Sequence, residues 1–319
     1  MKTINLVVGF TPYHALFSES FLADLRGETY CFFTKSYPNI PLGSKVKFFR
    51  CGKSLLVSYI FYALSLRVWF FKNYDIRLFC PHPCHFASNF PFFSGKCSSV
   101  TIYEDGVANY YDAVKPVWSL SLSKKILSFI TFLPFREYSG HVTGCDERNV
   151  DVCYVSRPSL IVGAKKFGEI VKKELKVTSR SRSRKKNKIL FLDQPTELSD
   201  EEKHLLLKKV VTMLGDRVTV YYKPHHESSS KYEFMEALPV GYVDMAAEEL
   251  VAISDYATVI SFNSSALINI QEIYDDISCY YIETVDKKIK VDGVLVSVYD
   301  FLAKNGVKSI LSSGLVNAS

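Results

Sequence analysis

The sequence of 319 residues contains no D-x-D tripeptide, the pair of aspartates that often holds a metal ion. Its eight cysteines follow no framework spacing and mostly lie inside apolar runs, which favours buried thiols in a reducing cytoplasm over disulfides. The opening stretch MKTINLVVGFTPYH has too short an apolar run, and no small-residue cleavage site, for a signal peptide. We therefore expect a first core strand there.

Apolar and aromatic residues, by contrast, are abundant. Hydrophobic residues make up 48% of the chain, with 23 Phe and 20 Tyr, which is enough for two sizeable cores and argues against disorder of the whole. The net charge of +6 is unevenly placed, because residues 179–188 hold six Lys and Arg and no acid. This basic run is either a solvated linker or a polybasic membrane anchor. It lacks the interleaved aromatics of a nucleic-acid site.

Short runs rich in Val, Ile, Phe and Tyr alternate with helical stretches, and they are apolar on both faces, as parallel strands covered by helices are. The strands expected in the first half are Ile4–Phe10, Thr29–Thr34, Lys45–Phe49, Ile76–Cys80, Ser99–Tyr103 and Val150–Val155. Those expected in the second half are Lys188–Leu192, Arg217–Tyr222, Gly241–Asp244 and Ala257–Phe262. Its expected helices are Ser199–Met213, opened by a capping box, then Ala246–Ile253 and one from Ser264.

This alternation predicts an α/β protein with two Rossmann-like domains facing each other across a cleft. We expect them at residues 1–160 and 188–319, joined by a helix and the basic linker at 161–187.

Two apolar stretches need separate interpretation. Leu55–Phe71 is short for a membrane span and is interrupted by polar residues, so a covered core helix is preferred over a membrane-embedded one. Trp118–Phe135 has the composition of an interfacial helix.

One predicted strand ends in a pair of carboxylates, Glu104 and Asp105, followed by Gly106, which lets the chain turn sharply. Adjacent carboxylates at a partly dry strand end repel each other, so one of them should have a raised pKa and could serve as a general base. The ordinary alternative is an acidic turn.

A second strand ends at Lys223-Pro224 and is followed by His225 and His226. A lysine and a histidine around a rigid proline suit a phosphate, and a histidine can protonate a leaving oxygen. The alternative is a pair of solvated loop histidines.

A third strand runs into Asn263, Ser264 and Ser265 at the start of a helix. Hydroxyl and N–H groups at a helix start bind anions, although a simple N-cap explains the same residues.

The loop Cys80–His85 holds four soft-metal ligands, but two prolines stiffen it and no second ligand pair follows at a suitable distance. A plain connection, or a loop that touches a substrate, is therefore preferred to a zinc site.

The order of these motifs, a carboxylate pair with glycine, then Lys-x-His, then Ser-Ser, resembles the bacterial sialyltransferases of the GT-B fold. It is most similar to the lipooligosaccharide and capsule sialyltransferases of glycosyltransferase family 52, including Thr11-Pro12-Tyr13 after the first strand. The resemblance covers most of the chain. It departs at His226, where the family has a proline, so either histidine could be the working one.

The resemblance implies a role for each motif. Asp105 would be the general base for the acceptor hydroxyl, with Glu104 beside it, and Asp193 is a spare candidate base. His225 would stabilise or protonate the departing CMP. The residues that would bind the donor are Thr11, Gln194, Lys223, His226, Asn263, Ser264 and Ser265, with Pro195 shaping the nucleotide pocket.

The implied function is an inverting transfer of sialic acid from CMP-sialic acid to a terminal galactoside of a bacterial lipooligosaccharide, O-antigen or capsule. Protein cations and N–H groups would stabilise the single phosphate, so no metal or other cofactor is expected. The expected location is the bacterial cytoplasm, with peripheral contact to the inner membrane as an option, and no nucleic-acid partner. The alternatives are a CDP-glycerol-type polymer transferase and a non-catalytic nucleotide-binding or membrane-docking protein.

Overall fold

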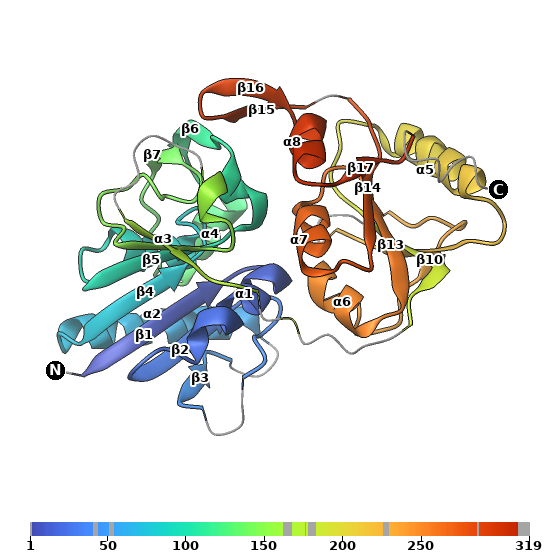
Figure 1. The fold of residues 1–319 in the computed structure, drawn as a ribbon. Coiled ribbons are helices and arrows are strands. Elements are labelled where there is room, and N and C mark those ends of the chain that lie inside the picture. The colour runs from blue at the N-terminus through green and yellow to red at the C-terminus, as the bar shows by residue number, and fades with distance from the viewer. Residues whose placement is uncertain are drawn as a thin grey trace. The chain divides into compact units, whose positions relative to one another are not determined.

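The computed structural model describes residues 2–40, 44–50, 54–161, 168–175, 177, 183–225, 230–285 and 287–311. The chain divides into two compact units, and each is built on a parallel β-sheet (Figure 1). Unit 1 comprises Met1–Lys176 with Lys290–Val294, and unit 2 comprises Val177–Ile289 with Leu295–Ser319. The second half of the chain therefore contributes a short segment to unit 1.

The sheet of unit 1 has the order β3-β2-β1-β4-β5-β8-β9, and all of its neighbours pair in parallel. Its strands are β1 (Thr3–Gly9), β2 (Glu28–Phe33), β3 (Val46–Phe48), β4 (Asp75–Cys80), β5 (Ser99–Tyr103), β8 (Val152–Val155) and β9 (Glu169–Lys172). The six strands expected in this half are confirmed to within a few residues. The strand order reverses between β1 and β4, and in sheets of this kind a ligand crevice forms at that point, beyond the carboxyl ends.

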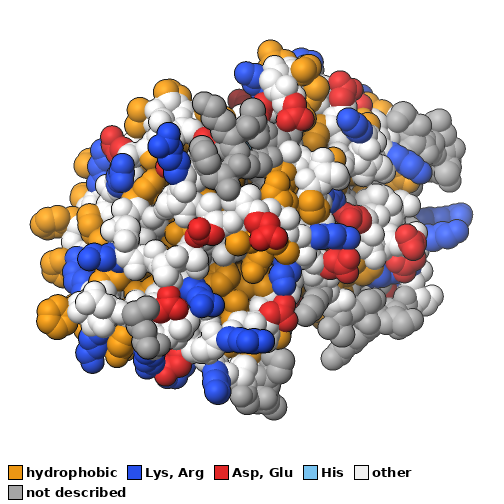
Figure 2. Space-filling model, turned by 60° about the vertical axis from the view of Figure 1, so that its left-hand side comes forward, with side chains coloured by type: hydrophobic (Ala, Val, Ile, Leu, Met, Phe, Trp, Pro, Cys, Tyr) orange, Lys and Arg blue, Asp and Glu red, His pale blue; other side chains and the backbone are white. Residues whose placement is uncertain are grey.

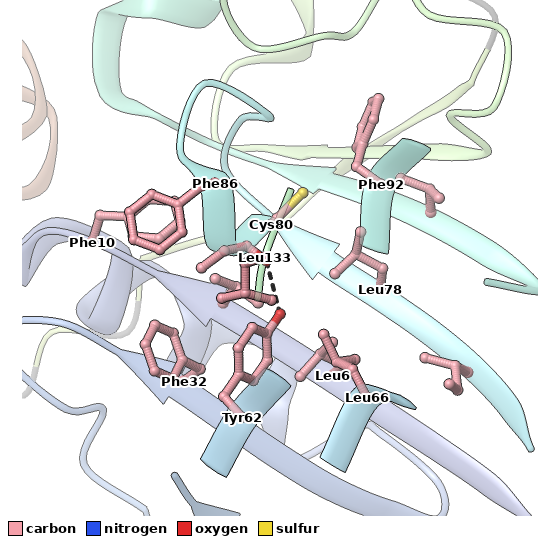
Figure 3. Packing of buried hydrophobic residues seen from close by; sticks show 14 of the residues in the cluster. Leu6, Phe10, Phe32, Tyr62, Leu66, Leu78, Cys80, Phe86, Phe92 and Leu133 are labelled. Carbon is pink, nitrogen blue, oxygen red and sulfur yellow. Dashed lines mark hydrogen bonds between the residues drawn. The ribbon is translucent and has the colours of Figure 1, made fainter. Parts of the chain in front are cut away.

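The main helices of unit 1 are α1 (Pro12–Leu22), α2 (Leu55–Phe71), α3 (Phe86–Phe93) and α4 (Leu122–Ile130), with 3-10 turns at Gly106–Tyr110 and Pro158–Leu160. An antiparallel pair, β6 (Val114–Trp118) and β7 (Tyr138–His141), was not predicted. The inner face of α2 packs on the sheet, where Tyr62 and Leu66 lie against Leu6 and Phe32 (Figure 3). Tyr62 also donates a hydrogen bond to the carbonyl of Ala87 (2.8 Å), so this large side chain is buried with its hydroxyl satisfied.

The sheet of unit 2 has the order β12-β11-β10-β13-β14-β17, again parallel throughout. Its strands are β10 (Lys185–Leu192), β11 (Thr219–Lys223), β12 (Glu236–Ala237), β13 (Tyr256–Ser261), β14 (Ser278–Tyr281) and β17 (Lys308–Ser309). The helices of unit 2 are α5 (Asp200–Leu214), α6 (Ala247–Ile253), α7 (Ser265–Ile273) and α8 (Val298–Lys304). The two-stranded pair β15 (Lys288–Val291) and β16 (Val294–Ser297) contains the segment Lys290–Val294 that is assigned to unit 1. The predicted capping box of Ser199 and Glu202 is present at the start of α5.

Two expectations about local structure were wrong. The segment 241–244 is a run of turns rather than a strand, because Gly241 has a φ of +94° and Tyr242 donates back to the Pro239 carbonyl. Helix α2 forms as expected but is covered on one face only, since seven of its large apolar side chains are exposed. None of the helices in the described ranges is long and apolar enough to cross a membrane.

The described part of the basic run is tied to unit 2. Arg184 binds the Asp276 carboxylate (2.8 Å) and the carbonyls of Val251 and Ser254. Lys188 and Lys185 pair with Asp255. Residues 179–182, which make up the rest of this run, lie outside the described residues.

Candidate active site

The carboxyl ends of β1, β4 and β5 bring Asp105 and His14 together in unit 1. Asp105 follows β5, whereas His14 lies in the first turn of α1, directly after β1. Nε2 of His14 lies 2.7 Å from Oδ1 of Asp105, and Nδ1 of His14 accepts a hydrogen bond from the Phe10 N–H (3.1 Å). Because a backbone N–H can only donate, the proton of neutral His14 is on Nε2 and is donated to Asp105.

Two further histidines from the Cys80–His85 loop have the same arrangement of ring nitrogens. Nδ1 of His82 accepts from the Cys84 N–H, and Nδ1 of His85 accepts from the Ala87 N–H, both at 3.2 Å. Nε2 of His82 therefore carries a proton and lies 3.8 Å from Oδ2 of Asp105. The loop thus contributes one oriented N–H group near the carboxylate, that of His82, whereas Nε2 of His85 lies 3.3 Å from the Tyr59 hydroxyl.

The protonation states of this cluster follow from burial and proximity. Burial lowers the pKa of His82 to about 4 and that of His85 to about 3, so both are neutral at pH 7. Burial alone would raise the pKa of Asp105, but the electrostatic attraction of His14 and His82 and the hydrogen bond from His14 outweigh it, and the pKa falls to about 2. The expectation of a raised pKa is therefore wrong for Asp105, which is an ionised carboxylate whose side chain is 24% exposed.

Glu104 has a different environment from its neighbour, because it is fully buried. Its Oε1 accepts from the Tyr13 hydroxyl (2.5 Å), and its Oε2 accepts from the Tyr110 hydroxyl (2.5 Å) and from both the N–H and the hydroxyl of Ser156 (2.6 and 2.8 Å). Burial and the adjacent carboxylate raise the pKa of Tyr110, which keeps that hydroxyl a donor. Glu104 thus joins β5 to α1 and to the chain after β8, and the geometry favours Asp105 as the base.

In unit 2 the residues after β10 are fixed by a buried ion pair. Nζ of Lys203 lies 2.5 Å from Oδ1 of Asp193 and donates to the Gln194 carbonyl (3.1 Å), while the Tyr222 hydroxyl donates to Oδ2 of Asp193 (2.7 Å). Both carboxylate oxygens are engaged and the side chain is buried, so Asp193 is unsuited to be the spare base. The pair instead holds the loop that carries Gln194.

Gln194 and Ser264 are brought together by neighbouring strand ends. Nε2 of Gln194 donates to Oγ of Ser264 (3.4 Å), which is the N-cap of α7 and also accepts from the Ala266 N–H (3.3 Å). Asn263 and Ser265 flank it and are half-buried. Within the described ranges, both contacts of Ser264 Oγ are with donors, which leaves its own proton for a bound anion at the helix start.

The remaining predicted residues fall at separate places. Lys223 ends β11 and donates to the Val243 carbonyl (2.6 Å), and burial lowers its pKa to about 8, against the attraction of nearby carboxylates. His225 is half-buried just beyond it, whereas His226 lies outside the described residues. Thr11 is in unit 1, where it caps α1 and accepts from the His14 N–H (3.2 Å).

The Cys80–His85 loop does not have the character of a zinc site. Cys84 donates to the Val142 carbonyl (3.1 Å), and burial raises the pKa of its thiol to about 11, so the sulfur is engaged here as a neutral thiol. Among the described residues, no three His, Cys, Asp or Glu side chains are arranged to hold a metal ion.

Three residues of the candidate site were not singled out by sequence reasoning: His14 and Lys203 were not considered, and His82 was considered only as part of the Cys80–His85 loop. Their signal was positional, since His14 and His82 each lie within five residues of a predicted strand end. Lys203 follows the capping box of a helix and has no distinguishing pattern of its own.

A family model for alpha-2,8-polysialyltransferases matches residues 57–283, more than half of the chain. No curated protein matches the sequence. Among solved structures, the GT-B domain of a sialyltransferase from Photobacterium damselae is similar over 96% of this chain and 99% of that one, with 9% identity and a TM-score of 0.50.

Two other structures share the fold. A putative UDP-N-acetylglucosamine 2-epimerase from Listeria monocytogenes covers all of this chain and 89% of its own, with 10% identity and a TM-score of 0.50. S. aureus MnaA with UDP covers all of this chain and 87% of its own, with 11% identity and a TM-score of 0.52. The fold is therefore of the GT-B type, with two Rossmann-like units.

Proposed function

Because the chain belongs to the alpha-2,8-polysialyltransferase family, we propose that it moves sialic acid from CMP-sialic acid to a glycan, with inversion at the reacting carbon. The observation that carries this proposal is the Asp105–His14 pair. It provides an ionised, partly exposed carboxylate with one oxygen held by His14. Oδ2 of Asp105 is the atom that would receive the proton of the acceptor hydroxyl.

The proposed reaction is a single displacement. The acceptor oxygen forms a bond to the anomeric carbon of the sialyl donor while the bond from that carbon to the phosphate oxygen breaks. CMP leaves with the bonding electron pair, and the hydroxyl proton passes to Asp105. A carboxylate with so low a pKa is a weak base, so proton transfer comes late, when the new bond has made the hydroxyl acidic.

The donor phosphate would be bound by unit 2. Ser264 and the N–H groups at the start of α7 suit its charge, with Gln194 beside them. Lys223 and His225 would stabilise charge on the departing CMP, and His225 would act as the general acid if one is needed. These groups would take the place of a divalent ion, so we propose a metal-independent reaction.

The acceptor belongs to the same proposal. The motif resemblance to family 52 favours a terminal galactoside of a bacterial surface glycan, whereas the name of the matching family favours a glycan that already ends in sialic acid. These two acceptors differ in the sugar that supplies the reacting hydroxyl, and the test therefore includes one acceptor of each kind.

The test is release of CMP from CMP-sialic acid in EDTA, with lactose or sialyllactose as acceptor, for the wild type, Asp105→Asn and His225→Ala. Asp216→Asn, at an exposed turn of unit 2, is the matched control. We expect wild-type and Asp216→Asn turnover with at least one acceptor, and loss of about 10³-fold in Asp105→Asn. If folded wild type binds CMP-sialic acid but consumes it with neither acceptor, a non-catalytic role replaces this proposal. Turnover of CDP-glycerol instead would assign the polymer transferase.

A further inference from the structure

Helix α2 exposes an apolar stripe where a helix on the surface of a soluble domain normally carries polar side chains. Val57, Phe61, Leu64, Val68 and Phe71 are all exposed, and their spacing of four and three residues places them on one face. Phe71 is 86% exposed. The opposite face of α2, with Tyr62 and Leu66, is the one that packs in the core (Figure 3).

Helix α4 is amphipathic in the reverse sense, with its apolar side toward solvent. Leu122, Ile126 and Phe129 share one face and are all exposed, Phe129 by 83%. The one fully buried side chain of α4 is that of Ser128. An amphipathic helix that turns its apolar face outward needs an apolar environment outside the protein.

Arg67 connects α2 to the segment that follows α4. This exposed residue of α2 places its guanidinium 5.9 Å from the ring centroid of Phe132, which follows α4 and is also exposed. We call the exposed side chains of α2, α4 and Phe132 the apolar face of unit 1. In Figure 2, hydrophobic side chains project from the molecular surface with Lys and Arg side chains among them.

The charged side chains within the two segments that carry the apolar face are all basic. Residues 54–74 and 113–136 contain no Asp or Glu. Arg67, Lys72, Lys124 and Lys125 are exposed within them. Asp75, Asp112 and Glu137 lie directly beyond these segments in the chain, and Glu137 is 3.6 Å from Lys125. A second copy of the chain would place these cations against their own equivalents, whereas an anionic surface would neutralise them.

From this combination of exposed Phe and Leu with flanking Lys and Arg, we infer that the apolar face docks unit 1 onto an anionic phospholipid bilayer. The side chains of Phe71 and Phe129 would enter the headgroup region, while Lys124 and Lys125 would contact lipid phosphates. Docking goes beyond the proposed reaction and does not depend on it. It would hold a catalytic unit at the surface where a lipid-anchored glycan is presented.

The test is co-sedimentation of the full chain with vesicles of phosphatidylcholine and phosphatidylglycerol, compared with phosphatidylcholine alone. We expect binding to the anionic vesicles, and a fall of about tenfold or more in the partition coefficient of Phe71→Ser/Phe129→Ser. Both side chains are mostly exposed, so the fold should survive. Leu205→Ser, an exposed apolar site on α5 of unit 2, is the matched control and should bind like the wild type.

A second pair of variants tests the charge. Lys124→Gln/Lys125→Gln should weaken binding to anionic vesicles, whereas the matched change Lys208→Gln/Lys209→Gln on α5 should not. The inference is overturned if the wild type fails to bind, or if it binds neutral and anionic vesicles equally. It is also overturned if light scattering without lipid shows a dimer that Phe71→Ser/Phe129→Ser converts to a monomer. None of these readouts requires turnover, so they are independent of the proposed reaction.

Discussion

His14 connects the backbone at the end of β1 to the carboxylate at the end of β5, because its Nδ1 accepts from the Phe10 N–H while its Nε2 donates to Asp105. The ring cannot turn over without losing both hydrogen bonds. One tautomer is therefore fixed, and one oxygen of Asp105 is held while the other remains for a substrate. His14 acts on the acceptor through Asp105, so it is a positioning residue.

Replacement of His14 should alter the pH dependence of turnover as well as its rate. Without the Nε2–H donor, burial raises the pKa of Asp105 unopposed by His14, so the acid limb of kcat/KM moves to higher pH. In the wild type that limb lies near the pKa of about 2, below the range of normal assays. We expect kcat to fall by about 10–100-fold in His14→Ala, measured as a pH–rate profile.

His14→Gln is the conservative control, because its amide N–H can replace Nε2 as a donor to Asp105. It should retain more activity than His14→Ala and show a smaller shift of the acid limb. Equal losses in the two variants, with no shift of the acid limb, would mean that His14 only fills space.

The lowered pKa of Asp105 also affects stability. Its ionised form stabilises the fold above the ordinary pKa of an aspartate, and this effect is lost as pH falls toward 2.

Glu104→Gln should mainly affect stability, whereas Asp105→Asn should mainly affect activity. Glu104→Gln places an amide NH₂ among four donors, so the folded state should lose about 1–3 kcal/mol and Tm should fall. Asp105→Asn should lower Tm less than Glu104→Gln, because only one of its oxygens is held by a short hydrogen bond, and should reduce turnover by about 10³-fold. The Tm of Glu233→Gln, the same change at an exposed site, gives the baseline for comparison. A Glu104→Gln protein with wild-type Tm but no activity would instead make Glu104 the base.

Sequence reasoning succeeded where the signal was local. The strands β1, β4 and β5 are mostly apolar and mostly buried, and short runs of this kind favour buried parallel strands. The turn after Asp105 was predicted from Gly106, which has a φ of +56°.

It failed where a role depends on residues far apart in the chain. The partners of Glu104 include Tyr13 and Ser156, which are 91 and 52 positions away, so its saturation by donors could not be anticipated from the dyad alone. The lowered pKa of Asp105 likewise depends on His14, 91 positions distant. The apolar pattern of α2 indicated burial on all sides, because a sequence pattern does not reveal whether any element covers the outer face.

The buried pair of Asp193 and Lys203 should stabilise unit 2 and position Gln194. Lys203→Met leaves a buried carboxylate unpaired and should cost about 3–5 kcal/mol in urea unfolding. Asp193→Asn/Lys203→Met should recover part of this loss, and the double-mutant cycle would measure the coupling. Lys209→Met, exposed on the same helix, is the control. An additive double mutant would contradict a direct interaction.

Lys223 should make donor affinity depend on pH in an accessible range. Burial lowers its pKa to about 8, so the ammonium is charged at pH 7 and loses its proton as pH rises through 8. If Lys223 binds the donor phosphate, KM for CMP-sialic acid should rise above pH 8 by up to about tenfold per unit.

Lys223→Arg, whose guanidinium stays charged, should keep KM flat to pH 9, whereas Lys208→Arg on the exposed face of α5 should behave like the wild type. Stability should move in the opposite direction to affinity. Between pH 8 and the ordinary lysine pKa of 10.5, the unfolded chain still binds the proton that the native state has lost. The free energy of unfolding therefore increases with pH in this range. A wild-type KM that stays constant from pH 7 to 9 would show that Lys223 does not bind the donor phosphate. The phosphate would then be bound by Ser264 and the start of α7.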